Sequence, residues 1–384
     1  MNASLYLHIP FCEHKCIYCD FYSLAPRGDG EGKEQALIRK FLVALESEIL
    51  LRTADGRFRT TCDTVFFGGG TPSLLEPSNI ATILDLLRAG FSVTEDAEIT
   101  LETNPGTVDR QKLAAFRKAG VNRVSVGIQS FHEDDLRFLT RIHSAEQAKE
   151  CVRNAFEAGF SNVSLDLMFA LPGQTMDRWK ENLEQAVALQ PTHLSCYSLI
   201  VEPGTPLQRM VESKQVAPLP PELDAELYAM TIEVLAVHGF EQYEVSNFCK
   251  RGFQSRHNVK YWSRGNYLGF GPSAHSHWDG LRWWNIANLP TYLQRLSAGA
   301  FPVAGEELLT LEQRKDEEVY LGLRSTGLDL KRFSESHGVD LRNRFWDVID
   351  RLVRAKLATA DDHVLKLTPQ GYAVCDEICC EFIR

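Results

Sequence analysis

The sequence predicts an α/β fold in which six strand-helix units form a parallel sheet that curves into an open or closed barrel. Short runs rich in β-branched and aromatic residues alternate along the chain with amphipathic segments of helical period. Such an alternation favours parallel strands joined by right-handed helical crossovers. Polar residues also follow the ends of several predicted strands, which is the edge where barrels of this kind carry their chemistry.

Each of the six units begins with a predicted strand. The strands are LYLHI at 5–9, TVFF at 64–67, EITLET at 98–103, RVSVGI at 123–128, NVSLDLMF at 162–169 and HLSCYSLI at 193–200. Amphipathic segments predict helices between them at 34–52, 109–119, 144–158 and 176–190. The 384 residues exceed one average domain, so we expect a barrel core at 1–240 followed by smaller units.

The last part of the chain predicts a smaller α+β unit at 305–384, after a connecting segment at 241–304. Helices are expected at about 310–324, 329–337 and 340–355, followed by two short strands and a final helix. This pattern resembles a winged-helix module. Modules of that kind often bind DNA, but the net charge of −10 and the lack of a Lys/Arg block argue against nucleic acid as a partner. We therefore interpret the unit as a lid or a protein-binding surface.

The composition is that of a globular protein, with 44% hydrophobic and 24% charged residues. No apolar run approaches 18 residues, and the first ten residues lack the charged start and apolar middle of a signal peptide. We expect a cytoplasmic protein with no integral membrane segment. In that reducing compartment the ten cysteines predict metal binding, catalysis or packing rather than disulfides.

Three of these cysteines, Cys12, Cys16 and Cys19, lie within eight residues in a C-x3-C-x2-C spacing. One tight loop can aim their soft thiolates at a common point, as zinc or an iron–sulfur cluster requires. Zinc would need a fourth ligand nearby, and the next thirty residues contain neither Cys nor His. The spacing therefore favours a four-iron cluster with one open iron over a chance grouping, which stays possible. The other seven cysteines are interpreted as packing residues.

The ends of the other predicted strands carry further candidate site residues. Taken singly, each has an ordinary explanation, because glycines often mark tight turns and carboxylates often cap helices. Together with Cys12 they would form one rim. These features are GGGTP at 68–72, Glu102, Gln129, Asp166 and Ser198.

At this point the sequence resembles the radical S-adenosylmethionine superfamily, in its coproporphyrinogen dehydrogenase-like branch. The motifs that carry the resemblance are YLHIPFCEHKCIYCDF, FFGGGTPS, VSVGIQSF, TRIHS and SLDLMFALPGQT, in that order. The resemblance implies a partial (β/α)6 TIM-like barrel in which Cys12, Cys16 and Cys19 hold a 4Fe-4S cluster. The open iron would chelate the methionine part of S-adenosylmethionine, and electron transfer from the reduced cluster would release a 5′-deoxyadenosyl radical. The residues that match cofactor contacts of this branch are Tyr6, Gly69, Gly70, Thr71, Glu102, Gln129, Arg141, Asp166 and Ser198.

For two residues we expect a contact with a particular part of the cofactor. Arg141 could offer its planar fork to the methionine carboxylate, and Tyr18 could stack beside the adenine. Coproporphyrinogen dehydrogenases of this branch carry a fourth cysteine where this chain has Phe21, and they carry a long segment before the cysteine motif where this chain has eleven residues. The sequence therefore lacks two features of those enzymes.

The segment RHNVKYW at 256–262, together with His275, His277 and neighbouring tryptophans, is the last informative feature. An aromatic lid is one interpretation, but aromatic rings and imidazoles also suit a flat macrocycle. H-N-x-x-Y-W is similar to the motif of HemW-type haem chaperones, so His257, Tyr261 and Trp262 are candidate haem residues. We expect a protein that binds haem and delivers it to haem-requiring proteins, such as respiratory enzymes. The alternative is a coproporphyrinogen III dehydrogenase or a related methyltransferase or cyclopropanase, so whether the protein is an enzyme stays open.

Overall fold

Twelve strands form the main sheet in the computed structural model, which describes residues 2–25 and 31–383. Six parallel strands occupy its centre in chain order, and all six were predicted from the sequence. The predicted and observed strands differ only in their ends, by up to six residues at the start of the third. The strands are β1 (Ala3–Ile9), β2 (Thr61–Gly69), β3 (Ser92–Thr103), β4 (Arg123–Gln129), β5 (Asn162–Phe169) and β6 (His193–Ser198).

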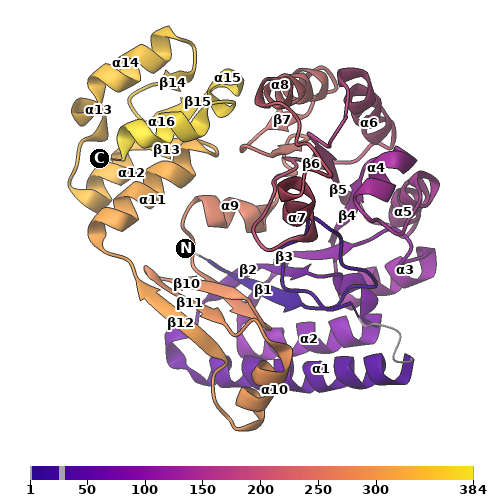
Figure 1. Cartoon of the computed structure of the whole chain (residues 1–384). Helices are drawn as coiled ribbons and strands as arrows, with labels where there is room; N and C mark the ends of the chain where they lie inside the picture. Colours follow the sequence, from indigo (N-terminus) through magenta and orange to yellow (C-terminus); the bar gives the residue numbers. More distant parts are fainter. Residues whose placement is uncertain (1, 26–30, 384) are drawn as a thin grey trace.

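Both edges of this parallel sheet are extended by strands from residues 241–308. Strand β9 pairs in parallel with β1, and β8 pairs antiparallel with β6. The strand order runs in one line from β12 to β7, so within the described residues the sheet curves without closing, as a partial barrel (Figure 1). The extra strands are β7 (Glu241–Gln242), β8 (Asn247–Cys249), β9 (Tyr267–Phe270), β10 (His275–Trp278), β11 (Leu281–Asn285) and β12 (Val303–Leu308).

Helices cover the outer face of the sheet (Figure 1). The four predicted helices are confirmed, and the last three of them begin at capping residues. For example, the Asp109 side chain accepts a hydrogen bond from the backbone N–H of Lys112, and Ser144 forms a capping box with Gln147. The helices are α1 (Glu31–Ala54), α2 (Pro77–Gly90), α3 (Arg110–Ala119), α4 (Glu133–Phe138), α5 (Ala145–Glu157), α6 (Met176–Ala188), α7 (Pro206–Glu212), α8 (Pro221–Val237), α9 (Arg256–Trp262) and α10 (Leu289–Ser297).

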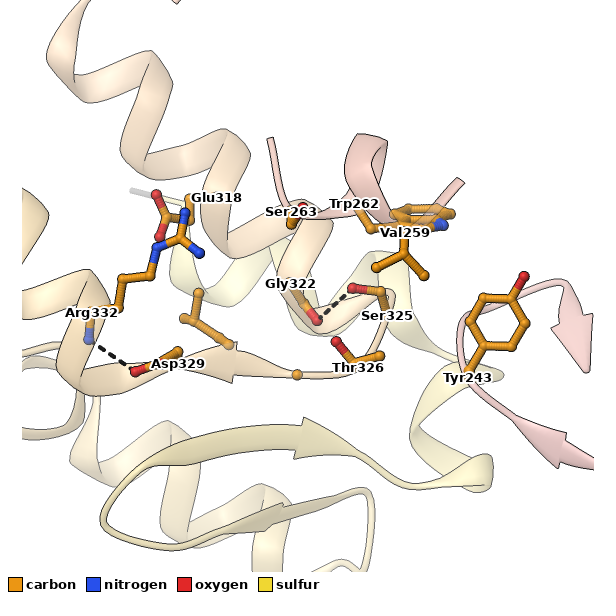
Figure 2. Close-up of a pocket in the computed structure, with 12 residues that line it drawn as sticks. Tyr243, Val259, Trp262, Ser263, Glu318, Gly322, Ser325, Thr326, Asp329 and Arg332 are labelled. Atoms are coloured by element: carbon orange, nitrogen blue, oxygen red, sulfur yellow. Dashed lines mark hydrogen bonds between the residues drawn. The ribbon is translucent and has the colours of Figure 1, made fainter. Parts of the chain in front are cut away.

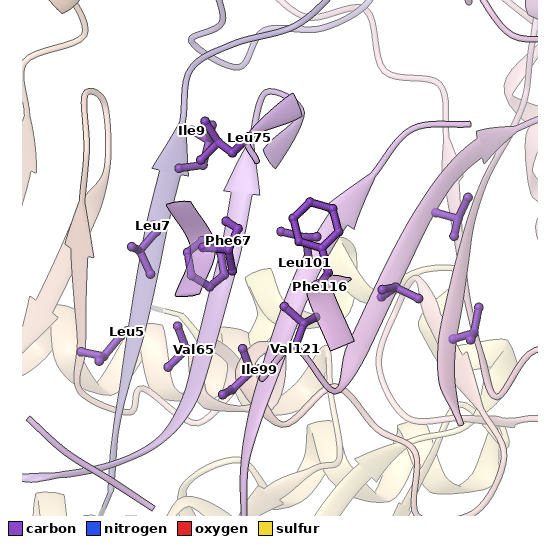
Figure 3. Close-up of a cluster of buried hydrophobic side chains, with 14 of the residues drawn as sticks. Leu5, Leu7, Ile9, Val65, Phe67, Leu75, Ile99, Leu101, Phe116 and Val121 are labelled. Atoms are coloured by element: carbon purple, nitrogen blue, oxygen red, sulfur yellow. The ribbon is translucent and has the colours of Figure 1, made fainter. Parts of the chain in front are cut away.

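The core lies between the sheet and these helices. Alternate residues of each strand point to opposite faces, so Leu5 and Leu7 of β1 lie in the core while Tyr6 between them faces the barrel interior. Burial of each such leucine stabilises the fold by about 1.5 to 3 kcal/mol. Figure 3 shows the outward layer, with labelled side chains Leu5, Leu7, Ile9, Val65, Phe67, Leu75, Ile99, Leu101, Phe116 and Val121.

A second, smaller core belongs to the C-terminal unit, as expected. Four helices precede a two-stranded turn, because the segment predicted as one helix at 340–355 forms two, and a further strand completes a small sheet of order β13-β15-β14. Arg264 joins this unit to the rest of the chain through ion pairs with Glu317 and Glu318. The boundaries 1–240, 241–304 and 305–384 themselves stay predictions. The elements are α11 (Leu311–Leu323), β13 (Leu328–Asp329), α12 (Leu330–His337), α13 (Leu341–Arg344), α14 (Trp346–Arg354), β14 (Ala358–Ala360), β15 (Val364–Leu367), α15 (Pro369–Tyr372) and α16 (Cys375–Phe382).

Across residues 2–25 and 31–383, the helices are all too short or too polar to span a bilayer.

Candidate functional site

The cysteine loop leaves the C-terminal end of β1 and folds back on itself. The backbone N–H of Cys12 donates to the carbonyl of Leu24 at 3.0 Å, and that of Cys19 donates to the carbonyl of Cys16 at 3.3 Å. Cys16 is buried, whereas Cys12 and Cys19 are partly exposed. The loop therefore presents all three thiols beside the rim of the sheet.

The surroundings of the three thiols suit a metal cluster. Burial raises the pKa of the Cys12 thiol, and it raises the pKa of the Cys19 thiol to about 11. Thr71 donates to the Cys12 sulfur at 3.6 Å, which favours the thiolate form of Cys12, and Arg141 donates to the Cys16 sulfur, also at 3.6 Å. Within the described residues no three acidic, His or Cys side chains are already gathered into a metal-binding group. The fit therefore rests on three soft donors in one loop with a buried cation beside them.

Arg141 uses most of its guanidinium on protein groups. Its Nη2 donates to Asn104 Oδ1 and to the carbonyl oxygen of Gly127, both at 2.6 Å, while its Nη1 faces Cys16. Its buried Nε has no hydrogen-bond partner. Only the N–H groups of Nε and Nη1 are therefore left to donate to a methionine carboxylate. That contact stays a prediction.

The triple glycine after β2 allows a close approach to the cysteine loop. The backbone N–H of Gly70 donates to the carbonyl of Ile9 at 2.8 Å, and a Cβ on Gly70 would lie 2.5 Å from the carbonyl oxygen of Phe11. Gly69 has φ of 105°, and a Cβ there would lie 2.6 Å from the ring of His8. No other residue type would let β2 end against this loop without displacing it.

A cavity of about 240 Å³ lies inside the partial barrel. Four residues predicted from the sequence, Tyr6, Gly69, Glu102 and Asp166, meet in its lining. Reasoning from the sequence missed several others, and alternation along β4 would have indicated two of them, because Arg123 and Ser125 alternate with the core residues Val124 and Val126. The missed residues are Phe21, Phe66, Arg123, Ser125, Ser195, Tyr197 and Asn258.

The two carboxylates of this cavity are held in an environment that favours their neutral forms. Burial, with the nearby charge of Asp166, raises the pKa of Glu102 to about 8, although the backbone N–H of Gly69 donates to it at 3.2 Å. Burial also raises the pKa of Asp166, against the opposing effects of Ser195, Arg123 and the Ser125 hydroxyl, which donates to Asp166 at 3.1 Å. Each carboxyl group can therefore accept hydrogen bonds from a polar ligand or, when protonated, donate one.

Helix α9, which carries the HNVKYW motif, forms a wall of the same cavity through His257, Asn258 and Tyr261. His257 is 1% exposed, its Nδ1 lies 2.9 Å from Thr64 Oγ1, and its Nε2 lies 2.8 Å from the Tyr261 hydroxyl. Burial lowers the pKa of His257 to about 3. The Thr64 hydroxyl donates its hydrogen to Ser4, so it must accept a hydrogen bond from Nδ1 of His257. The His257 ring is therefore assigned as neutral, with its proton on Nδ1 and with Nε2 accepting from the Tyr261 hydroxyl.

The third residue of the haem motif lies elsewhere. Trp262 lines a second cavity of about 200 Å³, between α9 and the C-terminal unit. Figure 2 shows Trp262 and Val259 on one side of that cavity and Ser325, Asp329 and Arg332 on the other. The motif is therefore split between two cavities.

Three other predicted contacts lie outside the lining of the barrel cavity. The Ser198 hydroxyl donates to Asp224 at 2.9 Å. Gln129 ends β4 with φ of 69°. Tyr18 packs in a small cluster with Leu139 and other apolar residues, and burial raises its pKa. Their roles toward the cofactor stay predictions.

Comparisons with known proteins identify the family of the chain. The model of the radical SAM superfamily matches residues 6–186, and the model of the HemN C-terminal domain matches residues 309–374. A protein named heme chaperone HemW from Bacillus subtilis (strain 168) is 36% identical over 98% of this chain and 97% of its own length. The chain belongs to the HemW family of the radical SAM superfamily.

Other relatives place the HemW family in a wider group. Heme chaperone HemW from Escherichia coli (strain K12) is 41% identical over 71% of this chain and 69% of its own length. A mitochondrial radical S-adenosyl methionine domain-containing protein 1 from Bos taurus is 42% identical over 71% of this chain and 60% of its own length. The solved structure of coproporphyrinogen III oxidase (HemN) from Escherichia coli superposes with a TM-score of 0.84 at 24% identity, over 100% of this chain and 90% of that chain. That likeness confirms the predicted fold.

Proposed function

We propose that the protein is a haem chaperone that carries a 4Fe-4S cluster and S-adenosylmethionine, binds haem and delivers it to haem-requiring proteins, respiratory enzymes among them. The observation that supports this most directly is the shared cavity. Residues expected to hold S-adenosylmethionine line one space inside the barrel together with His257 and Tyr261 of the α9 motif, which are expected near haem. A relative that is similar to this chain over almost its whole length is named a heme chaperone. The cluster thiolates need a reducing compartment, so we place the protein in the cytoplasm.

The cluster and the cofactor have candidate residues on the described loops. Cys12, Cys16 and Cys19 would hold the cluster, and the buried guanidinium of Arg141 beside Cys16 would offset its negative charge. Reduced cluster and S-adenosylmethionine together supply radical chemistry when both are bound. In this proposal the barrel residues Glu102 and Asp166 orient the cofactor by hydrogen bonds, and the cavity limits access of water to it.

The haem iron has two candidate axial ligands, which differ in access. His257 must exchange its hydrogen bond with Tyr261 for iron, because its lone-pair nitrogen is engaged inside the cavity. His275 is exposed, and its ring stacks on Trp284 with centroids 5.9 Å apart and an angle of 25°. We keep His257, Tyr261 and Trp262 as the candidate motif and add His275 as the accessible imidazole.

The alternative function is radical enzymology on a porphyrin or another substrate, such as oxygen-independent coproporphyrinogen III dehydrogenation, methyl transfer or cyclopropanation. The side chain at the position of the missing fourth cysteine, Phe21, is 62% exposed and lines the cavity. An apolar ring there offers neither a thiolate nor a hydrogen bond to a second cofactor, which favours the chaperone.

One pair of experiments tests the proposal. Haem titrated into the reconstituted protein should give a shifted Soret band, and haem-loaded protein should transfer its haem to an apo-cytochrome. An anaerobic assay with reduced cluster, S-adenosylmethionine and coproporphyrinogen III should yield no protoporphyrinogen IX. Turnover in that assay would establish the enzyme instead. His257→Ala and His275→Ala variants, compared in the same titration, would identify which imidazole reaches the iron.

A further inference from the structure

Arg123 is a buried cation that the proposed cofactor chemistry does not use. It is 2% exposed and begins β4, yet it lines the barrel cavity. Its Nε has no hydrogen-bond partner, and among the described residues its guanidinium forms no ion pair. A desolvated guanidinium without a partner is costly, so such a group inside a cavity indicates a missing anion.

Among the described residues, neither acidic residue of the cavity, Glu102 or Asp166, forms an ion pair with that guanidinium. The charge of Arg123 acts to lower the pKa of both Glu102 and Asp166, but the net pKa of each is raised, because burial outweighs the cation. Asp166 is bound instead by the Ser125 hydroxyl. The guanidinium therefore remains available to a ligand that enters the cavity.

The position of Arg123 separates it from the cluster. Arg141 contacts both Cys16 and the carbonyl of Gly127, so the cysteine end of the cavity lies at the level of Gly127. Arg123 lies four residues before Gly127 on the same strand. At about 3.3 Å per residue, the Cα atoms of the two residues are about 13 Å apart. A methionine carboxylate held at the open iron belongs to the Arg141 end, so the anion at Arg123 is a second one.

The lining of the cavity changes from apolar to cationic between its exposed and buried sides. Phe21 and Tyr197 are 62% and 40% exposed, whereas Arg123 is buried. The volume of about 240 Å³ is below the range of about 300 to 1,000 Å³ that encloses drug-sized ligands, so the cavity fits an arm of a large ligand rather than the whole of it. Haem has that form, with an apolar macrocycle and carboxylate arms.

We propose that Arg123 binds a carboxylate arm of the ligand inside the barrel, a propionate in the case of haem, while the apolar body of the ligand rests on Phe21 and Tyr197. The planar guanidinium suits bidentate binding of a carboxylate. The identity of the ligand as haem rests on the proposed function, whereas the anion site rests on Arg123 and its cavity. The two can be tested apart.

The test compares wild type with the Arg123→Met variant, which keeps much of the side-chain volume. The control is Arg251→Met, because Arg251 is exposed. Each protein is first shown to be folded by circular dichroism and by its iron content. Haem and haem dimethyl ester are then titrated into each. Haem should bind the Arg123→Met protein about 10-fold to 100-fold more weakly than wild type, and the ester should bind both proteins equally. Arg251→Met should match wild type with both ligands.

Two further measurements identify the source of the carboxylate and separate the two proposals. Affinity for S-adenosylmethionine should be the same in wild type and Arg123→Met, and a loss there with unchanged haem binding would overturn the proposal in favour of the cofactor. The second probe is 3-phenylpropionate, an apolar body with one carboxylate, which should raise the Tm of wild type but not of Arg123→Met. If haem binds neither protein while this difference in Tm persists, the anion site stands and the haem function fails. If haem, its ester and 3-phenylpropionate do not distinguish the two proteins, Arg123 is only structural.

Discussion

The cysteine loop and helix α9 are the two most conspicuous motifs of the chain, and they use their polar groups in opposite ways. The loop leaves Cys12 and Cys19 partly exposed at the rim of the sheet. Helix α9 buries His257 and engages both of its ring nitrogens with protein hydroxyls. The cysteine loop keeps two thiols available to a ligand, whereas α9 uses both ring nitrogens of His257 to hold the cavity wall together.

This difference shows why a motif does not by itself identify a ligand-binding residue. The backbone N–H groups of Arg256 and His257 donate to the Glu98 carboxylate, both at 3.1 Å, so the start of α9 is fixed to β3. His257 then links this helix to Thr64 on β2. The α9 motif therefore has two roles. It fixes the cavity wall to the sheet, and it forms part of the surface that a ligand in the cavity would contact.

The largest expected effect lies in the cysteine loop. Replacing Cys12, Cys16 or Cys19 with Ala should reduce the iron and sulfide of the reconstituted protein from about four of each per chain to nearly none, because three thiolates are the minimum for the proposed cluster. Iron and sulfide analysis with the visible absorption spectrum measures this. Cys62→Ala is the control, since Cys62 is buried in the core, and a cluster lost there instead would contradict the ligand assignment.

A second substitution tests the structural half of the comparison. His257→Ala should lower the free energy of unfolding by about 2 to 4 kcal/mol in the absence of haem, because it leaves buried hydroxyls of Thr64 and Tyr261 short of a partner and opens a void. Urea unfolding measures the change. His14→Ala, on the exposed part of the cysteine loop, should change it by less than about 0.5 kcal/mol. Equal stability of the His257 variant and wild type would show that the ring is held for a ligand only.

The carboxylates between the two motifs should show an intermediate effect. Asp166→Ala should weaken the binding of S-adenosylmethionine by about 1.5 to 3 kcal/mol, the value of a hydrogen bond to a charged group. Equilibrium dialysis on cluster-loaded protein measures the affinity. Asp85→Ala, at an exposed position of α2, serves as the control. Unchanged affinity in the Asp166 variant, with its cluster intact, would remove Asp166 from the cofactor site.

The last expected effect is a pH dependence of stability, which is small over any single pH unit. Because burial raises the pKa of Glu102 to about 8, the folded state holds a proton on this group that the unfolded state releases near pH 4.5. Stability from this group is therefore present below pH 4.5 and is lost as the pH rises toward 8, by at most about 1.4 kcal/mol per pH unit. Urea unfolding of wild type and Glu102→Gln at pH 6 and pH 8 measures it, and the variant should lose less stability between them. Parallel losses in the two proteins would show that Glu102 is ionised throughout.

The parallel sheet and much of the cavity could be predicted from the sequence because both follow from local periodicity. Strand β4 shows how far this reaches, since alternation places Arg123 and Ser125 on the face opposite the core residues Val124 and Val126. The wall formed by α9 could not be predicted, because its hydrogen bonds to β2 and β3 join residues 158 or more positions apart, such as Glu98 with Arg256. The partner of Ser198 could not be predicted either, since a strand end does not determine which neighbour its side chain binds, and here the hydroxyl donates to Asp224.

The wall formed by α9 also has a consequence for biosynthesis. The ribosome completes all six parallel strands and the three candidate cluster thiols before it adds residues 256–262, out of 384 in the chain. Until then the Glu98 carboxylate lacks the two backbone donors that later fix α9 to β3. The nascent barrel is therefore open on the side where α9 will lie, and a cluster can be loaded onto the cysteine loop before that wall exists.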